Sequence, residues 1–169
     1  MKNLISERPM AWMLVMAMPL WFGSCKKDAG ETVTPTATSI EGNYKVSALK
    51  VNPKVQGFED LLPVYSLLIG TTCLSDITVS FKSGGVVSTD SPASCQSNSD
   101  DIANATGIDS NSKWVSSGTK LTITDSDQTT TTYDVSFSGA NMQLAWQEDD
   151  IDATGKPFKQ GYTMELKRL

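Results

Sequence analysis

The sequence predicts an all-β chain built as an antiparallel meander of about eight short strands. Beyond Ile40, apolar and polar residues alternate with a period of two, and clusters of Gly, Ser, Asn and Asp separate the alternating segments. With 169 residues, 39% of them hydrophobic, the chain has the size and apolar content of one ordinary domain with a core. Such a meander protects its edge strands either by closing into a barrel or by pairing two sheets.

The expected strands follow one another from Gly42 to the C-terminus. The first lies within residues 42–51 and places Tyr44, Val46 and Ala48 on one face. The later strands carry apolar or aromatic residues on one face in the same way: Ile77, Val79 and Phe81; Val86 or Val87; Trp114; Leu121 and Ile123; Tyr133, Val135 and Phe137; Met142, Leu144 and Trp146; Tyr162, Met164 and Leu166. Residues 88–112 and 148–161 are expected to be long loops, the second strongly acidic at its start.

One segment between the first two strands departs from this period. Its apolar residues recur at helical spacing: Phe58, Leu61, Leu62, Tyr65, Leu68 and Ile69. Asp60 is placed to cap a helix, Pro63 falls in its first turn, and Gly70 is placed to end it. We therefore expect a short helix over residues 60–69, with an irregular strand as the alternative. Its apolar face would cover one mouth of a barrel.

The N-terminus predicts a bacterial lipoprotein signal peptide over residues 1–24. Residues 9–22 are almost entirely apolar, but they are fewer than the roughly 20 that a membrane-spanning helix needs. Gly23 and Ser24 then precede Cys25, which resembles the lipobox of bacterial lipoproteins, where the cysteine is lipidated. The alternative is a signal peptide cleaved elsewhere.

The lipobox divides the chain into three parts. We expect residues 25–39 to form a flexible polar tether and residues 40–169 to form the folded domain. Acyl chains on Cys25 would hold this domain at the bacterial outer membrane, on the periplasmic face or on the cell surface.

Two cysteines remain if Cys25 carries lipid. Cys73 and Cys95 are an even pair in a chain that we expect to enter an oxidising compartment, so we predict that they form a disulfide. Closing this loop would stabilise the fold by about 3 kcal/mol on a chain-entropy estimate. The chain has no Cys-x-x-Cys spacing, so we expect a structural role and not a redox role.

Composition argues against several function classes. The chain has no histidine, which removes His-based triads and His-ligated metal sites, and its net charge of −5 leaves no basic footprint for nucleic acid. Asp150 and Asp152 begin like a calcium loop, but Gly161 stands where an EF-hand needs its glutamate, which favours a solvated turn. No Gly-x-Ser-x-Gly motif and no selected pair of carboxylates is present. We expect no enzymatic activity and no cofactor.

Several motifs, taken in order, resemble the lipocalin-like lipoprotein domains of the Bacteroidota. Gly42-Asn43-Tyr44 stands where lipocalins carry Gly-x-Trp, and the segment from Cys73 to Asp76 resembles the family's Cys-x-x-Asp run. Residues 114–123 resemble the family's Trp-x-Leu-x-Gly-x-x-Leu-x-Ile hairpin. The resemblance covers residues 40–169. It implies a single up-and-down β-barrel with room for an interior cavity, and it carries over no catalytic residues.

Seven aromatic residues are candidates to line such a cavity: Tyr44, Phe81, Trp114, Tyr133, Phe137, Trp146 and Tyr162. Small barrels are often filled by their own side chains, so core packing is the alternative role for the same residues. We expect a lipid-anchored, lipocalin-like binding module of the cell envelope that holds a small apolar or amphipathic ligand. The alternative is a solid barrel whose loops contact a partner protein or a glycan.

Overall fold

The computed structural model describes residues 36–95, 106, 108–109 and 112–169. The predicted signal peptide, Cys25 and residues 25–35 of the predicted tether lie outside the described residues. The tether was predicted to reach residue 39, but its last three residues belong to helix α1, so the folded part begins earlier than expected. The strands are β1 (Gly42–Val55), β2 (Phe58–Asp60), β3 (Thr78–Lys82), β4 (Val86–Thr89), β5 (Lys113–Ser117), β6 (Lys120–Thr124), β7 (Thr130–Ser138), β8 (Asn141–Ile151) and β9 (Pro157–Arg168). The helices are α1 (Ala37–Ile40), α2 (Leu62–Ile69), α3 (Cys73–Asp76) and the 3-10 turn η1 (Ala93–Cys95). Within the described residues, no helix is long and apolar enough to span a bilayer.

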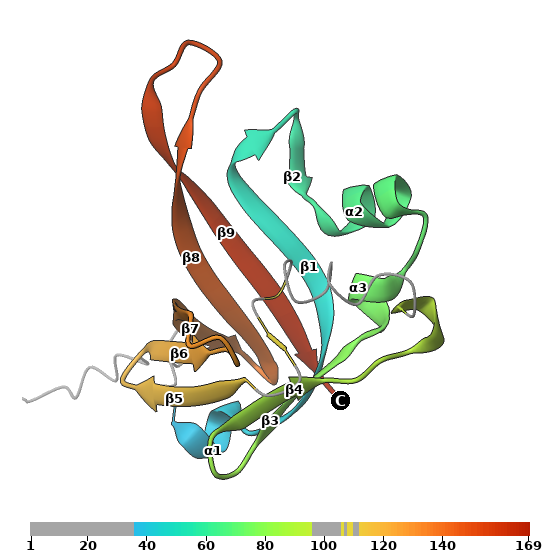
Figure 1. Cartoon of the computed structure of the whole chain (residues 1–169), viewed down its shortest axis with the longest axis vertical. Helices are drawn as coiled ribbons and strands as arrows, with labels where there is room; N and C mark the ends of the chain where they lie inside the picture. Colours follow the sequence, from blue (N-terminus) through green and yellow to red (C-terminus); the bar gives the residue numbers. More distant parts are fainter. Residues whose placement is uncertain (1–35, 96–105, 107, 110–111) are drawn as a thin grey trace, which may run out of the picture.

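The sheet confirms the predicted fold, because it closes on itself as an antiparallel barrel. From β3 to β9 each strand pairs with the next along the chain, and β1 pairs with both β3 and β9. Eight strands therefore form the barrel, and the extra strand β2 pairs only with the far half of β1. Figure 1 shows that β1, β8 and β9 are the long strands and extend beyond the other strands of the barrel as one tall wall, with β2 beside the upper part of β1.

A β-bulge in β1 changes which of its residues face the barrel interior. Val46 is opposite Leu166, whereas Ala48 is opposite Glu165, so Ser47 is the extra residue. Beyond the bulge it is Leu49, and not Ala48, that continues the inward face after Val46. The alternation predicted for Ala48 was wrong because sequence periodicity does not register an inserted residue.

The predicted long loop over residues 148–161 is mostly strand. β8 continues to Ile151 and β9 begins at Pro157, with an unbroken ladder that pairs Asp149 with Lys159 and Asp150 with Phe158. The acidic residues led to the prediction of a loop, because charged residues are depleted in strands that contact a core. Here they are tolerated because the upper part of the hairpin is exposed on both faces.

The predicted short helix is confirmed, but it begins later and covers less than expected. α2 starts at Leu62 because Asp60 is paired with Lys50 in the β1–β2 ladder. One oxygen of the Asp60 carboxylate accepts the N–H groups of Leu49 and Leu62, each at 3.0 Å. Gly70 ends the helix in a left-handed conformation, as predicted. Among the side chains of this helix that the structure describes, only Leu62 joins the core, while Leu67 and Leu68 are exposed, so this part of α2 does not seal a mouth of the barrel.

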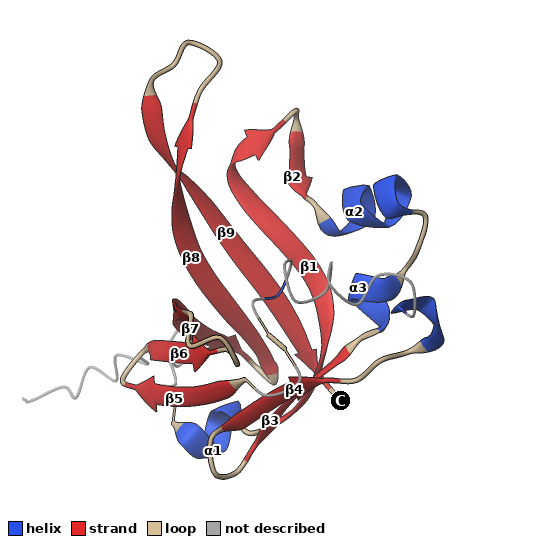
Figure 2. Cartoon of the chain, viewed as in Figure 1, coloured by secondary structure: helices blue, strands red, loops and turns tan. Residues whose placement is uncertain are grey.

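The predicted disulfide is present. Cys73 in α3 is bonded to Cys95 in η1, and both residues are buried in the core. Thr71 supports the junction by donating its hydroxyl to the carbonyl of Ser94 at 2.6 Å. Figure 2 shows α2 and α3 together on the side of β1 away from β9.

Candidate functional site

The structure divides the seven candidate aromatic residues into two groups. Tyr44, Phe81 and Trp114 form the first, and all three are buried. Phe81 contacts Tyr44 and Trp114 edge-to-face, with both pairs of ring centroids 5.9 Å apart. The guanidinium of Arg168 lies 5.4 Å from the centre of the Tyr44 ring. These rings project from β1, β3 and β5 into the barrel interior and contact one another there, so their role is core packing.

The second group lies where the long strands leave the rest of the barrel. Buried Tyr133 contacts half-buried Trp146 edge-to-face at 5.5 Å, and Trp146 stacks on half-buried Tyr162 at 5.2 Å. Phe137 is partly buried against the core. Of the seven candidates, only Trp146 and Tyr162 border the pocket that we identify as the candidate site.

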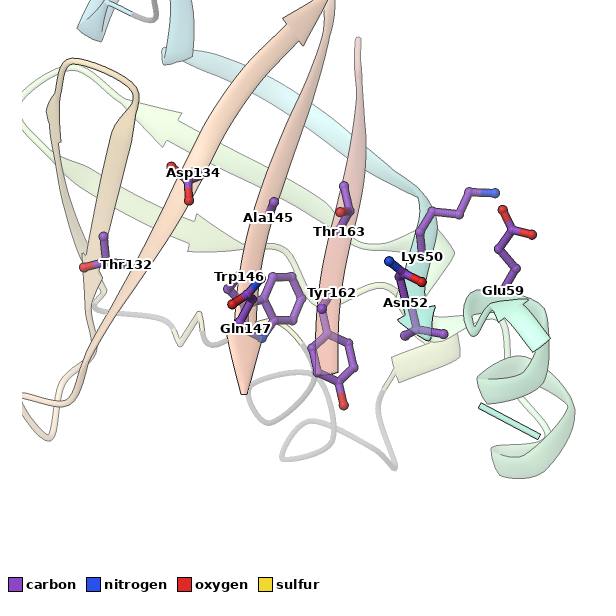
Figure 3. A pocket seen from close by; sticks show the side chains of 12 residues that line it. Lys50, Asn52, Glu59, Thr132, Asp134, Ala145, Trp146, Gln147, Tyr162 and Thr163 are labelled. Atoms are coloured by element: carbon purple, nitrogen blue, oxygen red, sulfur yellow. The ribbon is translucent and has the colours of Figure 1, made fainter. Parts of the chain in front are cut away.

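This pocket, with a volume of about 560 Å³, lies along the wall made by β7, β8, β9 and β1 (Figure 3). Its lining combines the aromatic pair with polar and small residues: Lys50, Val51, Asn52, Glu59, Thr132, Asp134, Ala145, Trp146, Gln147, Gly161, Tyr162 and Thr163. Most of these residues alternate with the core residues of their strands. The pocket is therefore formed mainly by the outward positions of the wall.

The strand pairing explains why the wall is hollowed at this point. β7 pairs with β8 only as far as Asp134 opposite Ala145, while β8 continues alongside β9 for six more residues, to Ile151. Beyond this pair β7 and β8 diverge, so Thr132 on β7 and Gln147 on β8 lie on opposite sides of the gap between them. In the middle of the wall, the outward residues Ala145, Gly161 and Thr163 are small, which leaves a shallow floor.

Gly161 is needed where β9 passes β1. A Cβ atom at this position would lie 3.2 Å from the carbonyl oxygen of Asn52, which is tighter than ordinary van der Waals contact. The neighbouring Gln160 is buried, and its side-chain amide donates to the carbonyl of Pro53 at 2.8 Å. Together these contacts hold the far half of β1 against β9 and fix the position of Asn52 at the pocket.

Charged residues border the pocket on opposite sides. The Lys50 ammonium lies 3.5 Å from Asp60, and Asp134 lies 2.6 Å from Lys120. Asn52, Thr132, Gln147 and Thr163 supply neutral donors and acceptors between these pairs. Because each charge already has a partner, the arrangement favours a ligand that is recognised by hydrogen bonds and not by a net charge.

Carboxylates surround the aromatic pair. The indole N–H of Trp146 donates to a carboxylate oxygen of Glu148 at 2.9 Å. Burial raises the pKa of Tyr162, and the negative charges of Glu148 and Asp150 raise that pKa further. This negative surrounding disfavours an anionic ligand beside the rings.

Sequence reasoning identified the aromatic pair but missed the polar lining. Lys50, Asn52, Gln147 and Thr163 occupy outward strand positions, where polar residues are expected in any exposed strand. The only signal in the sequence was the small size of Ala145 and Gly161. Each of them alternates with core residues on its own strand and therefore falls on the outward face.

No group of three or more potential metal ligands comes together among the described residues. Asp152, part of the calcium-like run in the sequence, lies in the turn between β8 and β9. One of its oxygens accepts the N–H groups of Thr154 and Lys156 and the Thr154 hydroxyl, so this carboxylate organises the turn.

Comparison with protein-family models, curated proteins and solved structures found no match to this chain. The fold and the pocket define a closed antiparallel β-barrel with an amphipathic pocket on its wall. Such a barrel is compatible with a ligand-binding module.

Proposed function

We propose that the chain is a lipid-anchored, non-enzymatic binding module of the bacterial cell envelope, and that it holds a small amphipathic ligand. The observation that carries the proposal is the pocket on the wall of the closed barrel, which neutral hydrogen-bonding side chains line from outward strand positions and which half-buried Trp146 and Tyr162 border from inward positions. Its volume of about 560 Å³ is within the range of about 300–1,000 Å³ that is usual for small-molecule sites.

The division of the aromatic residues favours an amphipathic over a purely apolar ligand. The rings of Tyr44, Phe81 and Trp114 already occupy the interior around them, so these residues offer no apolar surface to a ligand. At the wall pocket, Asn52 and Thr163 can bind hydroxyl or amide groups from outward positions, while the stacked Trp146 and Tyr162 border the pocket from inward positions and supply its apolar part. A molecule with both kinds of surface matches this lining.

Two features of the sequence support the envelope location. Cys25 follows an apolar segment of signal-peptide length. The Cys73–Cys95 disulfide is of a kind that persists in oxidising compartments outside the cytosol. The anchor is tested by Cys25→Ala, which should move the protein from the membrane fraction to the soluble fraction, with Cys73→Ala as a matched cysteine control. Retention of the Cys25→Ala protein in membranes would show that the anchor is wrong.

Native mass spectrometry of the chain purified from its own host tests the ligand. We expect a bound mass that disappears on denaturation. Ala145→Trp, which fills the floor of the pocket from an outward position, should abolish this mass, whereas Val115→Trp on exposed β5 should leave it unchanged. A bare mass for the unsubstituted chain, or equal loading of both variants, would contradict the proposal.

A fluorescence titration tests the same site in solution. From Cys25 onward the chain contains two tryptophans, buried Trp114 and half-buried Trp146. Adding decyl maltoside, an amphiphile with a neutral sugar head, should change the emission of Trp146. The change should persist in Trp114→Phe and disappear in Trp146→Phe.

The second candidate is a solid barrel that acts through its surface. The filling of the interior around Tyr44, Phe81 and Trp114 favours it, because that part of the barrel leaves no space for cargo. Under this alternative, the native mass would be that of the bare chain or of a complex with another envelope protein.

A further inference from the structure

Exposed apolar side chains gather on one flank of the molecule. Nine large apolar residues are exposed among the described residues, and five of them fall within residues 55–68. We call these five the apolar flank: Val55, Phe58, Tyr65, Leu67 and Leu68. They come from the β1–β2 hairpin and from α2, which lie next to each other beside the wall (Figure 1).

Helix α2 provides the most exposed part of this flank. Its eight residues, Leu62–Ile69, include no charged side chain. Leu67 is 83% exposed and Leu68 is 78% exposed, whereas Leu62 at the start of the helix is buried. The core therefore requires Leu62, but nothing in the described fold requires leucine at positions 67 and 68. Leu67 and Leu68 are adjacent on the helix, and exposed apolar side chains that gather in one place often mark an interaction site.

We propose that the apolar flank rests on the lipid bilayer to which the chain is anchored, so that the domain is oriented with α2 against the membrane. The proposal depends on the anchoring proposed above. Thr36 follows Cys25 by eleven residues, which reach at most about 40 Å when fully extended. β9, with twelve residues, has a similar length of about 40 Å. Fully extended, the tether therefore spans about the length of β9, which leaves the domain room to turn the apolar flank toward the bilayer.

The tether also makes a weak contact sufficient. Because the anchor holds the domain near the bilayer, the apolar flank meets the lipid at a high effective concentration. A few exposed leucines can therefore orient the anchored domain, although they would not bind an unanchored domain to the membrane. Tyr65 is 39% exposed beside these leucines and has the amphipathic character of residues found at membrane interfaces.

The charges beside the flank are already paired. Lys54 lies 3.1 Å from Glu59, and Lys50 lies 3.5 Å from Asp60. The flank thus presents apolar surface with balanced charge at its border. This suits a lipid surface regardless of its anionic content, and it gives a protein partner no charge pattern to recognise.

Position-specific tryptophans test the proposal. Full-length Leu68→Trp and Val115→Trp chains are reconstituted into vesicles of phosphatidylethanolamine and phosphatidylglycerol with brominated acyl chains. Val115 is the matched control because it is 67% exposed but lies on β5, away from the flank. Emission of each chain is compared with that of the unsubstituted protein. Quenching of the added tryptophan should be at least about twofold stronger for Leu68→Trp, because interfacial residues insert to the acyl boundary.

Equal quenching at both positions, or none at Leu68→Trp, would overturn the inference. A concentration-dependent dimer without vesicles that is lost in Leu67→Asp/Leu68→Asp would also overturn it, since a second copy would then cover the flank. The comparison of two positions does not depend on how the N-terminus attaches. Failure of the unsubstituted chain to float with vesicles, by contrast, would count against the anchor itself.

Discussion

At the scale of single residues, Trp114 joins two strands that their backbones barely connect. β4 and β5 share one ladder pair, Val86 opposite Lys113. The indole N–H of Trp114 donates to the carbonyls of Lys82 and Val86, at 3.2 and 3.1 Å. The Trp114 backbone also passes close to Gly85: a Cβ atom on residue 85 would lie 2.9 Å from the carbonyl oxygen of Trp114. One side chain therefore replaces much of a missing ladder.

We expect Trp114→Phe to lower the free energy of unfolding by about 2 kcal/mol. The substitution removes the indole donor that the Lys82 and Val86 carbonyls share and leaves a gap beside Phe81. Urea denaturation measures the change. Val115→Ala, at the exposed neighbouring position, should change stability by less than about 0.5 kcal/mol. Equal stability of Trp114→Phe and the unsubstituted chain would show that the indole does not join these strands.

We expect the buried Tyr133 to make the stability of the fold sensitive to alkaline pH. Burial raises its pKa to about 12 from the ordinary value of 10.0, and its hydroxyl donates to the carbonyl of Thr106. A pKa that is raised in the folded state contributes stability that is fully present below pH 10 and is lost as pH rises from 10 toward 12. Unfolding measured across this range should show a steeper loss for the unsubstituted chain than for Tyr133→Phe. Parallel curves would contradict the assignment.

At the scale of elements, the disulfide connects the helical segment to the chain that follows β4. Besides the bond between Cys73 and Cys95, the Asp76 carboxylate accepts the hydroxyls of Thr72 at 2.6 Å and Ser94 at 2.8 Å. These two hydrogen bonds, from Thr72 and then Ser94, lower the pKa of Asp76. α3 and η1 thus form one cross-linked unit at the side of the barrel.

We expect the paired substitution Cys73→Ala/Cys95→Ala to reduce the free energy of unfolding by about 3 kcal/mol, because the bond closes a loop with a sequence separation of 22 residues. Thermal or urea unfolding of oxidised and reduced protein measures the same difference. The reductant should leave the stability of the double variant unchanged. If it lowers that stability too, its effect does not come from this bond.

At the scale of the whole molecule, the barrel closes unevenly. The β8–β9 ladder runs from Met142 to Ile151, whereas β4 and β5 are joined by a single ladder pair and by two further backbone hydrogen bonds, Val87 to Ser112 and Trp114 to Gly85. The barrel therefore has a strong wall at β1, β8 and β9 and a weak seam between β4 and β5.

Native-state hydrogen exchange should reveal this seam. Amides of Val87 and Trp114 are expected to exchange faster than those of Leu144 and Met164, because opening the seam breaks few backbone hydrogen bonds. Trp114→Phe should speed exchange at the seam more than at the wall. Uniform exchange across both regions would indicate that the barrel opens only as a whole.

Local patterns predicted much of this structure. The alternation of Tyr133, Val135 and Phe137 predicted β7 and its inward face, and Gly70 marked the end of α2. The cysteine pair predicted the disulfide. In each case a few consecutive residues, or one simple pairing rule, contain the necessary information. The loop predicted from the acidic run at residues 148–150 was wrong, because these residues form a strand only through their pairing with β9.

The all-β character, the approximate strand count, the short helix and the set of aromatic residues follow from the amino-acid sequence alone. Which rings pack, which border a pocket and where apolar surface stays exposed depend on how distant strands pair. Alternation separates inward from outward residues on one strand. It does not contain the register between strands, the bulge at Ser47 or the point where β7 leaves β8. Those depend on contacts between distant segments, and they set Trp146 and Tyr162 on the inward face of the same stretch of wall that carries Asn52 and Thr163 on its outward face.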